Sequence, residues 1–281
     1  KIPNKYNLRL LFKLILLIQR TDFIYIFYPG NLGTIVSFII LLLRKPYGMY
    51  IRGQNYNRNC IDRVILRKST FNCVVSPLFV DKLKQFDAHA ILIKPMIAFD
   101  KNDIIKNRNY SNTLPVKLLF VGSVSQHKGI YELIEIAKLL YNNKLKFELN
   151  IVGGGKLFEE INDIIQCEQL SHIIKLHGLV SDKDQLQRFY TDSTAVIITS
   201  HNEGFPRVIY EAMLSGLPIF TTFVGGIPGR MINNYNCIEI PLNNPNNAAS
   251  IILKAINDNQ LLQSIGTEGC NTFNQLINIS F

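Results

Sequence analysis

Short apolar segments rich in β-branched and aromatic residues alternate along the second half of this chain with longer segments of helical periodicity. Strands are expected at 117–121, 146–152, 173–176, 195–199 and 218–221. Helices are expected at 130–141, 156–167, 182–190 and 207–214. Strands that alternate with helices pair in parallel, so this pattern restricts the chain to an α/β fold.

The first third of the chain shows the same alternation. Helices are expected at 6–19, 31–43, 62–68 and 77–85, with strands at 23–28, 48–51, 73–75 and 90–93. We expect a parallel sheet covered on both faces. Residues 99–115 are crowded with Asp, Asn, Lys and Ser, as is typical of a linker. The 281 residues therefore predict an N-terminal domain at 1–98, a linker at 99–115 and a C-terminal domain at 116–281.

The net charge of +9 is unevenly distributed. Residues 1–100 hold 15 Lys and Arg against 5 Asp and Glu, whereas residues 101–281 hold 15 against 16. A basic N-terminal part is suited to an anionic partner such as a phospholipid surface, a lipid diphosphate or nucleic acid, and it also fits a solvated basic face. No aromatic-interleaved RNA motif or helix-turn-helix signature is present, which argues against nucleic acid.

The cysteines and the apolar runs indicate the cellular compartment. Five cysteines, widely spaced and without a CxxC pair, indicate neither a disulfide framework nor a zinc site, and we expect a reducing cytoplasm. The longest apolar stretch, 35–43, is too short to span a bilayer. Lys13 interrupts the apolar run near the start, and no cleavage site follows, so no signal peptide is predicted.

Two glycine-containing loops follow predicted strands, where an open parallel sheet binds its ligands. In the first loop, Gly122 allows the backbone to approach a ligand and Lys128 supplies a cation before a helix, a combination suited to a diphosphate. A glycine turn with a surface lysine explains the same residues. In the second loop, Gly153 begins a run of three glycines that permits close approach, or that forms a flexible turn.

The segment 199–218 is the most informative. Gly204 forms a turn, Pro206 is expected at the first helical position and Gly216 ends the helix. The helix therefore points its N-terminus at the ligand edge of the sheet, where free N–H groups near 205–208 can hold phosphate oxygens. Two carboxylates, Glu203 and Glu211, can address different parts of one ligand.

Glu203 and Glu211, separated by seven residues in EGFPRVIYEAMLSGLPI, resemble the E-x7-E motif of retaining glycosyltransferases of glycosyltransferase group 1, family 4-like. The flanking segments resemble the family in the same order. They are FVGSVSQHKG, LNIVGGG, LHGLVSDKDQLQRFY, TTFVGGIPG and NCIEIP. The resemblance covers about 116–275 and, more faintly, 6–100. It implies the α/β GT-B fold, in which two Rossmann-like doubly wound parallel-sheet domains face a cleft. Because the chain opens on what resembles a middle helix, we expect an incomplete, N-terminally truncated first domain.

The resemblance also implies residue roles. Glu211 would accept hydrogen bonds from the nucleotide ribose, and Glu203 would hold the donor sugar with neighbouring backbone N–H groups. Lys128 would neutralise the leaving diphosphate, and Leu179 and Val180 would flank the base. The donor-binding set is Gly122, Ser123, Lys128, Gly153, Leu179, Val180, Glu203, Gly204, Phe205, Pro206, Arg207, Val208 and Glu211. The catalytic set is Glu203, Lys128 and Arg52.

Some positions depart from the family pattern. Ser123 stands where an arginine is common, and Gly229, followed by Arg230, stands where glutamate is common. Arg52 occupies the place of a histidine near the reacting sugar; it suits a phosphate clamp better than a general base, and a strand-end ion pair explains it equally well. An Asp-Lys-Asp sequence at 182–184 resembles a metal motif, but it falls at a predicted helix start. We expect no cofactor and no required metal.

These features together predict a cytoplasmic glycosyltransferase, peripheral to the inner face of the plasma membrane. It would transfer sugar with retention from a nucleotide-diphosphate sugar to a lipid-linked or oligosaccharide acceptor, in the biosynthesis of a cell-surface polysaccharide or lipopolysaccharide. One alternative is a GT-B sugar-nucleotide epimerase, which would form an epimer without an acceptor. The other is a catalytically inert pseudo-glycosyltransferase that only binds its ligand.

Overall fold

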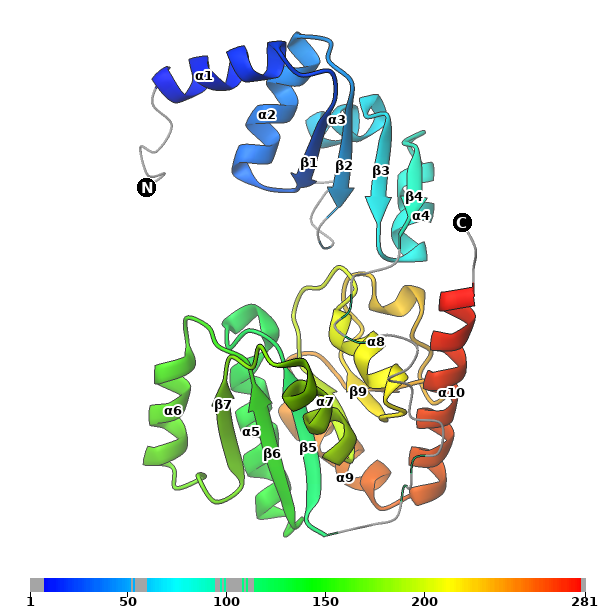
Figure 1. Ribbon diagram of the computed structural model, residues 1–281. Coiled ribbons are helices and arrows are strands. Elements are labelled where there is room, and N and C mark those ends of the chain that lie inside the picture. The colour runs from blue at the N-terminus through cyan, green and yellow to red at the C-terminus, as the bar shows by residue number, and fades with distance from the viewer. Residues whose placement is uncertain are drawn as a thin grey trace. The chain divides into compact units, whose positions relative to one another are not determined.

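The computed structural model describes residues 8–51, 53, 60–93, 97, 99, 108, 110 and 114–278. It divides the chain into two compact units. The first comprises residues 1–95, with 203–205 grouped with it, and the second comprises 96–202 and 206–281. Each unit has its own parallel sheet and its own hydrophobic core, so each is described separately (Figure 1).

The first unit is a four-stranded parallel sheet with strand order β1-β2-β3-β4. Its elements follow in the order α1 (Leu8–Gln19), β1 (Ile24–Tyr28), α2 (Asn31–Leu42), β2 (Tyr47–Ile51), α3 (Cys60–Lys68), β3 (Phe71–Val74), α4 (Pro77–Lys84) and β4 (Ala90–Leu92). Every predicted helix and strand in this part is present, with boundaries within two residues. The periodicity of the sequence was therefore sufficient to locate these elements.

The strand order of the first sheet leaves one of its faces open in the described residues. Successive right-handed crossovers that step in one direction place α2, α3 and α4 on the same face. On β1, Ile26 and Tyr28 are buried, whereas Tyr25 and Phe27 are 46% and 51% exposed. Aromatic rings of the neighbouring strands lie beside them, with the centroids of Phe27 and Tyr50 5.5 Å apart. The expected cover on both faces is therefore not seen for this sheet.

The second unit is a six-stranded parallel sheet with strand order β10-β9-β8-β5-β6-β7. Its elements are β5 (Val116–Val121), α5 (Ile130–Asn142), β6 (Phe147–Val152), α6 (Phe158–Cys167), β7 (Ile174–Gly178), α7 (Lys183–Asp192), β8 (Ala195–Ile198), α8 (Arg207–Leu214), β9 (Ile219–Thr221), β10 (Ile238–Glu239), α9 (Pro245–Ile256) and α10 (Asn259–Asn278). The predicted elements again match within two residues, while β10, α9 and α10 had not been assigned bounds.

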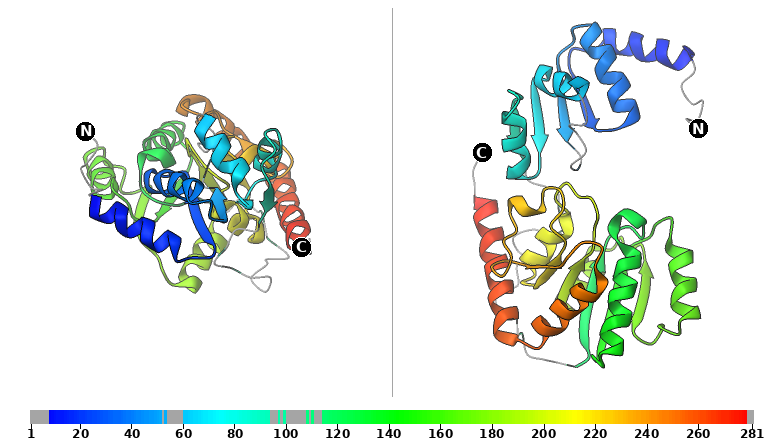
Figure 2. Two further views of the ribbon diagram at one scale, coloured as in Figure 1. Left: turned by 90° about the horizontal axis from the view of Figure 1, so that it is seen from above. Right: turned by 180° about the vertical axis from the view of Figure 1, so that it is seen from behind.

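This second sheet is doubly wound. From β5 the chain steps outward through β6 and β7, then returns beside β5 at β8 and steps the opposite way through β9 to β10. Helix α9 packs against α5, and α10 packs against α8, so both faces are covered (Figure 2). The direction of winding reverses between β5 and β8, which is the topological switch point where open α/β sheets bind ligands.

A single arginine from the predicted linker ties two helices of the second unit together. The Arg108 guanidinium donates hydrogen bonds to the carbonyl oxygens of Tyr190 (3.2 Å), Thr191 (3.2 Å) and Ser193 at the end of α7. It also donates to the carbonyl of Ser215, which caps the end of α8, at 3.0 Å. Burial lowers the pKa of Arg108 below its usual range. We call this arrangement the Arg108 clamp.

Two other described residues of the predicted linker also pack on the second unit. The hydroxyl of Tyr110 donates to the carbonyl oxygen of Gly216, just beyond α8, at 2.7 Å. Phe99 is 4% exposed, and its ring meets that of Tyr190 edge-on at 5.5 Å. This stretch therefore contributes side chains to the unit that follows it.

Candidate functional site

The loops that follow β5 and β8, on either side of the switch point, are joined by hydrogen bonds. The hydroxyl of Thr199 donates to the carbonyl oxygen of Lys128 at 3.0 Å. The backbone N–H of His201 donates to the carbonyl oxygen of His127 at 2.9 Å. Since both strands are parallel, the two loops leave the same edge of the sheet, and these bonds fix them side by side.

Glycines allow these loops to approach one another backbone to backbone. Gly129 has φ +66°, and a Cβ there would lie 2.0 Å from the carbonyl oxygen of Thr199. Gly153, in the loop after β6, has φ +139°, and a Cβ would lie 1.9 Å from the carbonyl oxygen of Gly122. Only glycine adopts these geometries without displacing its neighbour. Gly153 therefore has a packing role in addition to its predicted contact with the sugar-nucleotide donor.

We expect Gly153→Ala to lower the free energy of unfolding by roughly 2 kcal/mol or more, from left-handed backbone strain and the clash with Gly122. The adjacent Gly154→Ala is the matched control, because a Cβ at Gly154 meets no atom within 4 Å. It should change stability by less than about 1 kcal/mol. Chemical denaturation of both variants measures the difference, and equal stabilities would contradict the packing described here.

Helix α8 presents its N-terminus at this edge. It begins at Arg207, and Pro206 is its N-cap residue, with φ −71°. We expected this proline at the first helical position, and it is instead the residue just before that position. The N–H groups of Arg207 and Val208 are in the first turn and have no partner within the helix. The side chain of Arg207 is exposed, whereas Phe205 and Val208 are 5% and 8% exposed. The apolar residues anchor the turn, and its backbone N–H groups are those predicted to hold phosphate oxygens.

Both predicted carboxylates are buried, Glu203 at 8% exposure in the loop and Glu211 at 6% on α8. The hydroxyl of Tyr190, at the end of α7, donates a 2.7 Å hydrogen bond to Oε2 of Glu211. Burial, and secondarily the Glu211 carboxylate, raises the pKa of Tyr190 well above its usual range. Tyr190 is therefore a neutral donor throughout the physiological pH range.

The other predicted donor residues lie in the loops at the carboxyl ends of the strands. The Ser123 hydroxyl is 2.9 Å from that of Ser125, and Lys128 is half-buried in a 3₁₀ turn before α5. In the loop after β7, Leu179 is 83% exposed and Val180 is half-buried. Arg52 lies outside the described residues, so its predicted role stays a prediction, as do the roles of the others.

Buried polar atoms without a protein partner occur in the same loops. Oδ1 of Asn202, after β8, and Nε of Arg230, after β9, are buried and have no hydrogen-bond partner among the described residues. Nε2 of His201 lies 2.9 Å from Oε1 of Glu132 on α5. Buried polar atoms are nearly always hydrogen-bonded, so unpaired ones at this edge are expected where a bound ligand supplies the partner.

The acidic sequence at 182–184 is at the start of α7. Oδ1 of Asp182 accepts a 2.7 Å hydrogen bond from the backbone N–H of Gln185, which is an N-cap interaction. In the part of the chain that the structure describes, no group of three or more His, Cys, Asp and Glu side chains could hold a metal ion. The Asp182 carboxylate is thus engaged in helix capping.

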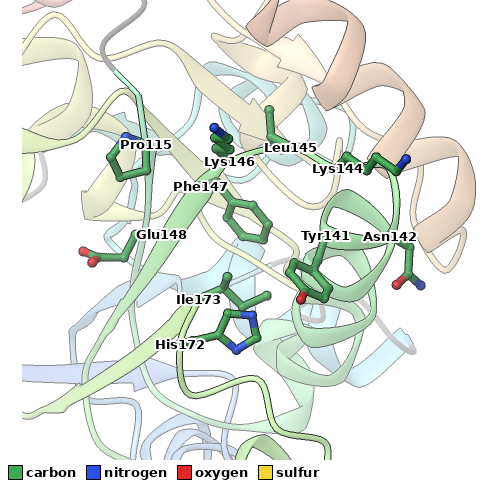
Figure 3. A pocket seen from close by; sticks show the side chains of 10 residues that line it. All are labelled: Pro115, Tyr141, Asn142, Lys144, Leu145, Lys146, Phe147, Glu148, His172 and Ile173. Carbon is green, nitrogen blue, oxygen red and sulfur yellow. The ribbon is translucent and has the colours of Figure 1, made fainter.

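A cavity of about 680 Å³ lies at the opposite, amino-terminal edge of the second sheet (Figure 3). It is lined by the end of α5, the turn after it and the starts of β6 and β7, with Tyr141, Lys146 and His172 among its residues. None of the predicted site residues lines it. The candidate site is therefore defined by converging loops rather than by this hollow.

Two residues of the site region were missed by the sequence interpretation. Tyr190 had been placed only as the last residue of a helix, and Arg108 only as part of a linker. Each acts through a contact with a residue remote in sequence, 21 positions away for Tyr190 and up to 107 for Arg108. For Tyr190, the only sequence signal of a buried contact was an aromatic residue near the end of a polar helix. For Arg108, the sequence gave no such signal.

Solved structures share this architecture of two parallel-sheet Rossmann-like units, which is the GT-B fold. Staphylococcus aureus TarM, solved in complex with UDP among other ligands, matches with a TM-score of 0.74 and 19% identity, over 93% of this chain and 55% of TarM. Anabaena HepE, solved in complex with UDP, matches with a TM-score of 0.71 and 17% identity, over 95% of this chain and 78% of HepE. At these identities the likeness concerns the fold.

The chain belongs to the family Glycosyl transferases group 1, which matches residues 101–272. An uncharacterized glycosyltransferase of Methanocaldococcus jannaschii is 33% identical over 151 residues, covering 54% of this chain and 41% of that protein. The capsular polysaccharide biosynthesis glycosyltransferase CapM of Staphylococcus aureus is 28% identical over 152 residues, covering 53% and 39%. The match thus spans about two fifths of the length of these relatives.

Proposed function

We propose that the second unit binds a nucleotide-diphosphate sugar and that the protein transfers the sugar to an acceptor. The observation that carries the proposal is the switch point, which the loops after β5 and β8 flank. Glu203 lies in the second of these loops, and α8, which carries Glu211, begins where that loop ends. Helix N-termini at such points hold phosphate groups. The unpaired buried atoms of Asn202 and Arg230 support a ligand at the same edge.

In this proposal, Glu211 binds the ribose hydroxyls, and Glu203 with the backbone of 204–208 binds the sugar and the diphosphate. Lys128 neutralises charge on the leaving diphosphate, Gly122, Ser123 and Gly153 line the phosphate path, and Leu179 and Val180 flank the base. Arg52 acts on the acceptor side. The transfer needs no metal, because a cation and helix N–H groups neutralise the diphosphate.

We propose a lipid-linked or oligosaccharide acceptor and a product that is a cell-surface polysaccharide or lipopolysaccharide, formed with retention at the anomeric carbon. The relative named for capsular polysaccharide biosynthesis supports the product class. The basic surplus of residues 1–100 favours contact with an anionic membrane at the cytoplasmic face. Among the described residues, no helix has the length and apolar character needed to span a bilayer.

A thermal-shift screen against UDP-, GDP- and ADP-sugars tests the donor site. A donor at 100 times its dissociation constant stabilises the folded state by about 2.7 kcal/mol. For a protein of this size we expect the melting temperature to rise by roughly 5 to 10 °C with the right donor. Glu211→Ala should abolish the rise. If none of the sugar nucleotides shifts the melting temperature, the donor-site proposal is wrong.

A further inference from the structure

One oxygen of the Glu211 carboxylate is already committed within the protein. Oε2 accepts the 2.7 Å hydrogen bond from Tyr190, and both side chains are buried. The described residues give no hydrogen bond to Oε1. Tyr190 therefore restrains one oxygen of the carboxylate, Oε2, and Oε1 is the oxygen that could bind a ligand.

The donor of this bond is itself held rigidly. The Tyr190 side chain is fully buried, its ring meets Phe99 edge-on, and its own carbonyl oxygen accepts from Arg108. The Arg108 clamp also bonds the carbonyl that ends α8, the helix that carries Glu211. Tyr190 on α7 and Glu211 on α8 thus lie on two helices whose C-terminal ends are bonded to the same guanidinium.

A phenol hydroxyl is well suited to orienting a carboxylate that must bind a ligand. A lysine or arginine in the place of Tyr190, bonded directly to the carboxylate, would neutralise its charge and weaken it as an acceptor for neutral hydroxyls. A phenol hydroxyl restrains the orientation of the carboxylate and leaves its negative charge in place, where hydrogen bonds to charged groups are the strong ones. Fixing the carboxylate before binding also removes the entropy cost of fixing it during binding.

We infer that Tyr190 is a positioning residue that orients the Glu211 carboxylate toward the ribose hydroxyls of the donor nucleotide. The inference rests on the proposed function, because it presupposes that a nucleotide binds at Glu211. It assigns Tyr190 no contact with the nucleotide. Its effect should therefore appear only with ligands that carry ribose hydroxyls.

The test is Tyr190→Phe, which keeps the buried ring and removes only the hydroxyl. Affinities for UDP, GDP and ADP, and for the 2′,3′-dideoxy form of whichever binds, are measured by calorimetry. We expect the variant to bind the ribonucleotide about tenfold more weakly, because a carboxylate that is no longer oriented would lose the equivalent of one hydrogen bond to the ribose. Its affinity for the dideoxy nucleotide should stay within about twofold of that of the unmodified protein.

Tyr131→Phe is the matched control. Tyr131 also donates to a carboxylate, Oε1 of Glu160 at 2.6 Å, but this pair joins the first turns of α5 and α6 and does not involve Glu211. The control should bind both nucleotides normally. In the Glu211→Gln background, Tyr190→Phe should have no further effect, because both substitutions act on one interaction.

The outcomes separate the two proposals. If the unmodified protein binds none of the nucleoside diphosphates, the proposed function fails. If it binds one of them and Tyr190→Phe binds it equally well, or loses affinity for ribose and dideoxy forms alike, the positioning role is wrong. Circular dichroism and the melting temperature of the variant show whether it folds, and an additive effect with Glu211→Gln would also overturn the inference.

Discussion

Replacing Arg108 by alanine is expected to lower the free energy of unfolding by about 3 kcal/mol or more. The substitution removes a guanidinium that donates to four carbonyl oxygens and leaves the ends of α7 and α8 without these partners. For a unit of this size the melting temperature should fall by roughly 6 to 12 °C. Differential scanning calorimetry measures both quantities.

Two further variants test whether the lost hydrogen bonds cause the expected loss of stability. Arg108→Lys keeps the charge but cannot bond two helix ends at once, so it should recover only part of the loss. Arg188→Ala removes an exposed arginine from α7 and should change stability by less than about 0.5 kcal/mol. An Arg108→Ala protein that melts at the temperature of the unmodified chain would show that the clamp does not contribute to stability.

Replacing Glu203 by alanine is expected to reduce sugar transfer by roughly 100- to 1,000-fold, the range found when one group that stabilises a transition state is removed. Glu203 is buried in the loop that leads into α8, so its carboxylate is fixed where the proposed donor sugar lies. The assay follows release of nucleoside diphosphate from the sugar nucleotide that gives the largest thermal shift.

Glu203→Gln separates charge from shape in this prediction. It should fold, retain the thermal shift with the nucleoside diphosphate and still lose most of the turnover, because the amide keeps the volume and removes the charge. Glu160→Gln, in the first turn of α6 and outside the proposed donor-binding residues, should transfer normally. Normal turnover by Glu203→Ala would exclude its catalytic role, and an epimer formed without acceptor would rule out transfer as the reaction.

Local patterns were sufficient for the positions of the helices and strands, because hydrophobic periodicity and turn residues act over a few positions. The bounds of α8 match those predicted, and Asp182 caps α7 as its place in the sequence suggested. The carboxyl-edge position of the loop with Glu203, and of the start of α8 that follows it, also results from parallel strand pairing. These features require knowledge of neighbours in sequence only.

Contacts between distant segments could not be predicted in the same way. The bond between Tyr190 and Glu211 and the hydrogen bonds of Arg108 depend on how α7, α8 and the preceding segment pack together. A polar, aperiodic stretch was read as a linker, although Arg108 and Tyr110 within it are bonded to the second unit. Polar composition does not reveal such bonds.

The Arg108 clamp has a practical consequence for dissecting the protein. A fragment that starts at Val116, where the first strand of the second sheet begins, would discard Arg108, Tyr110 and Phe99. Its α7 and α8 would lose their shared anchor, and Tyr190 would lose the ring that packs against it. A fragment made to test donor binding should therefore begin before Phe99, and one that starts at Val116 is expected to be less stable for reasons unrelated to any ligand.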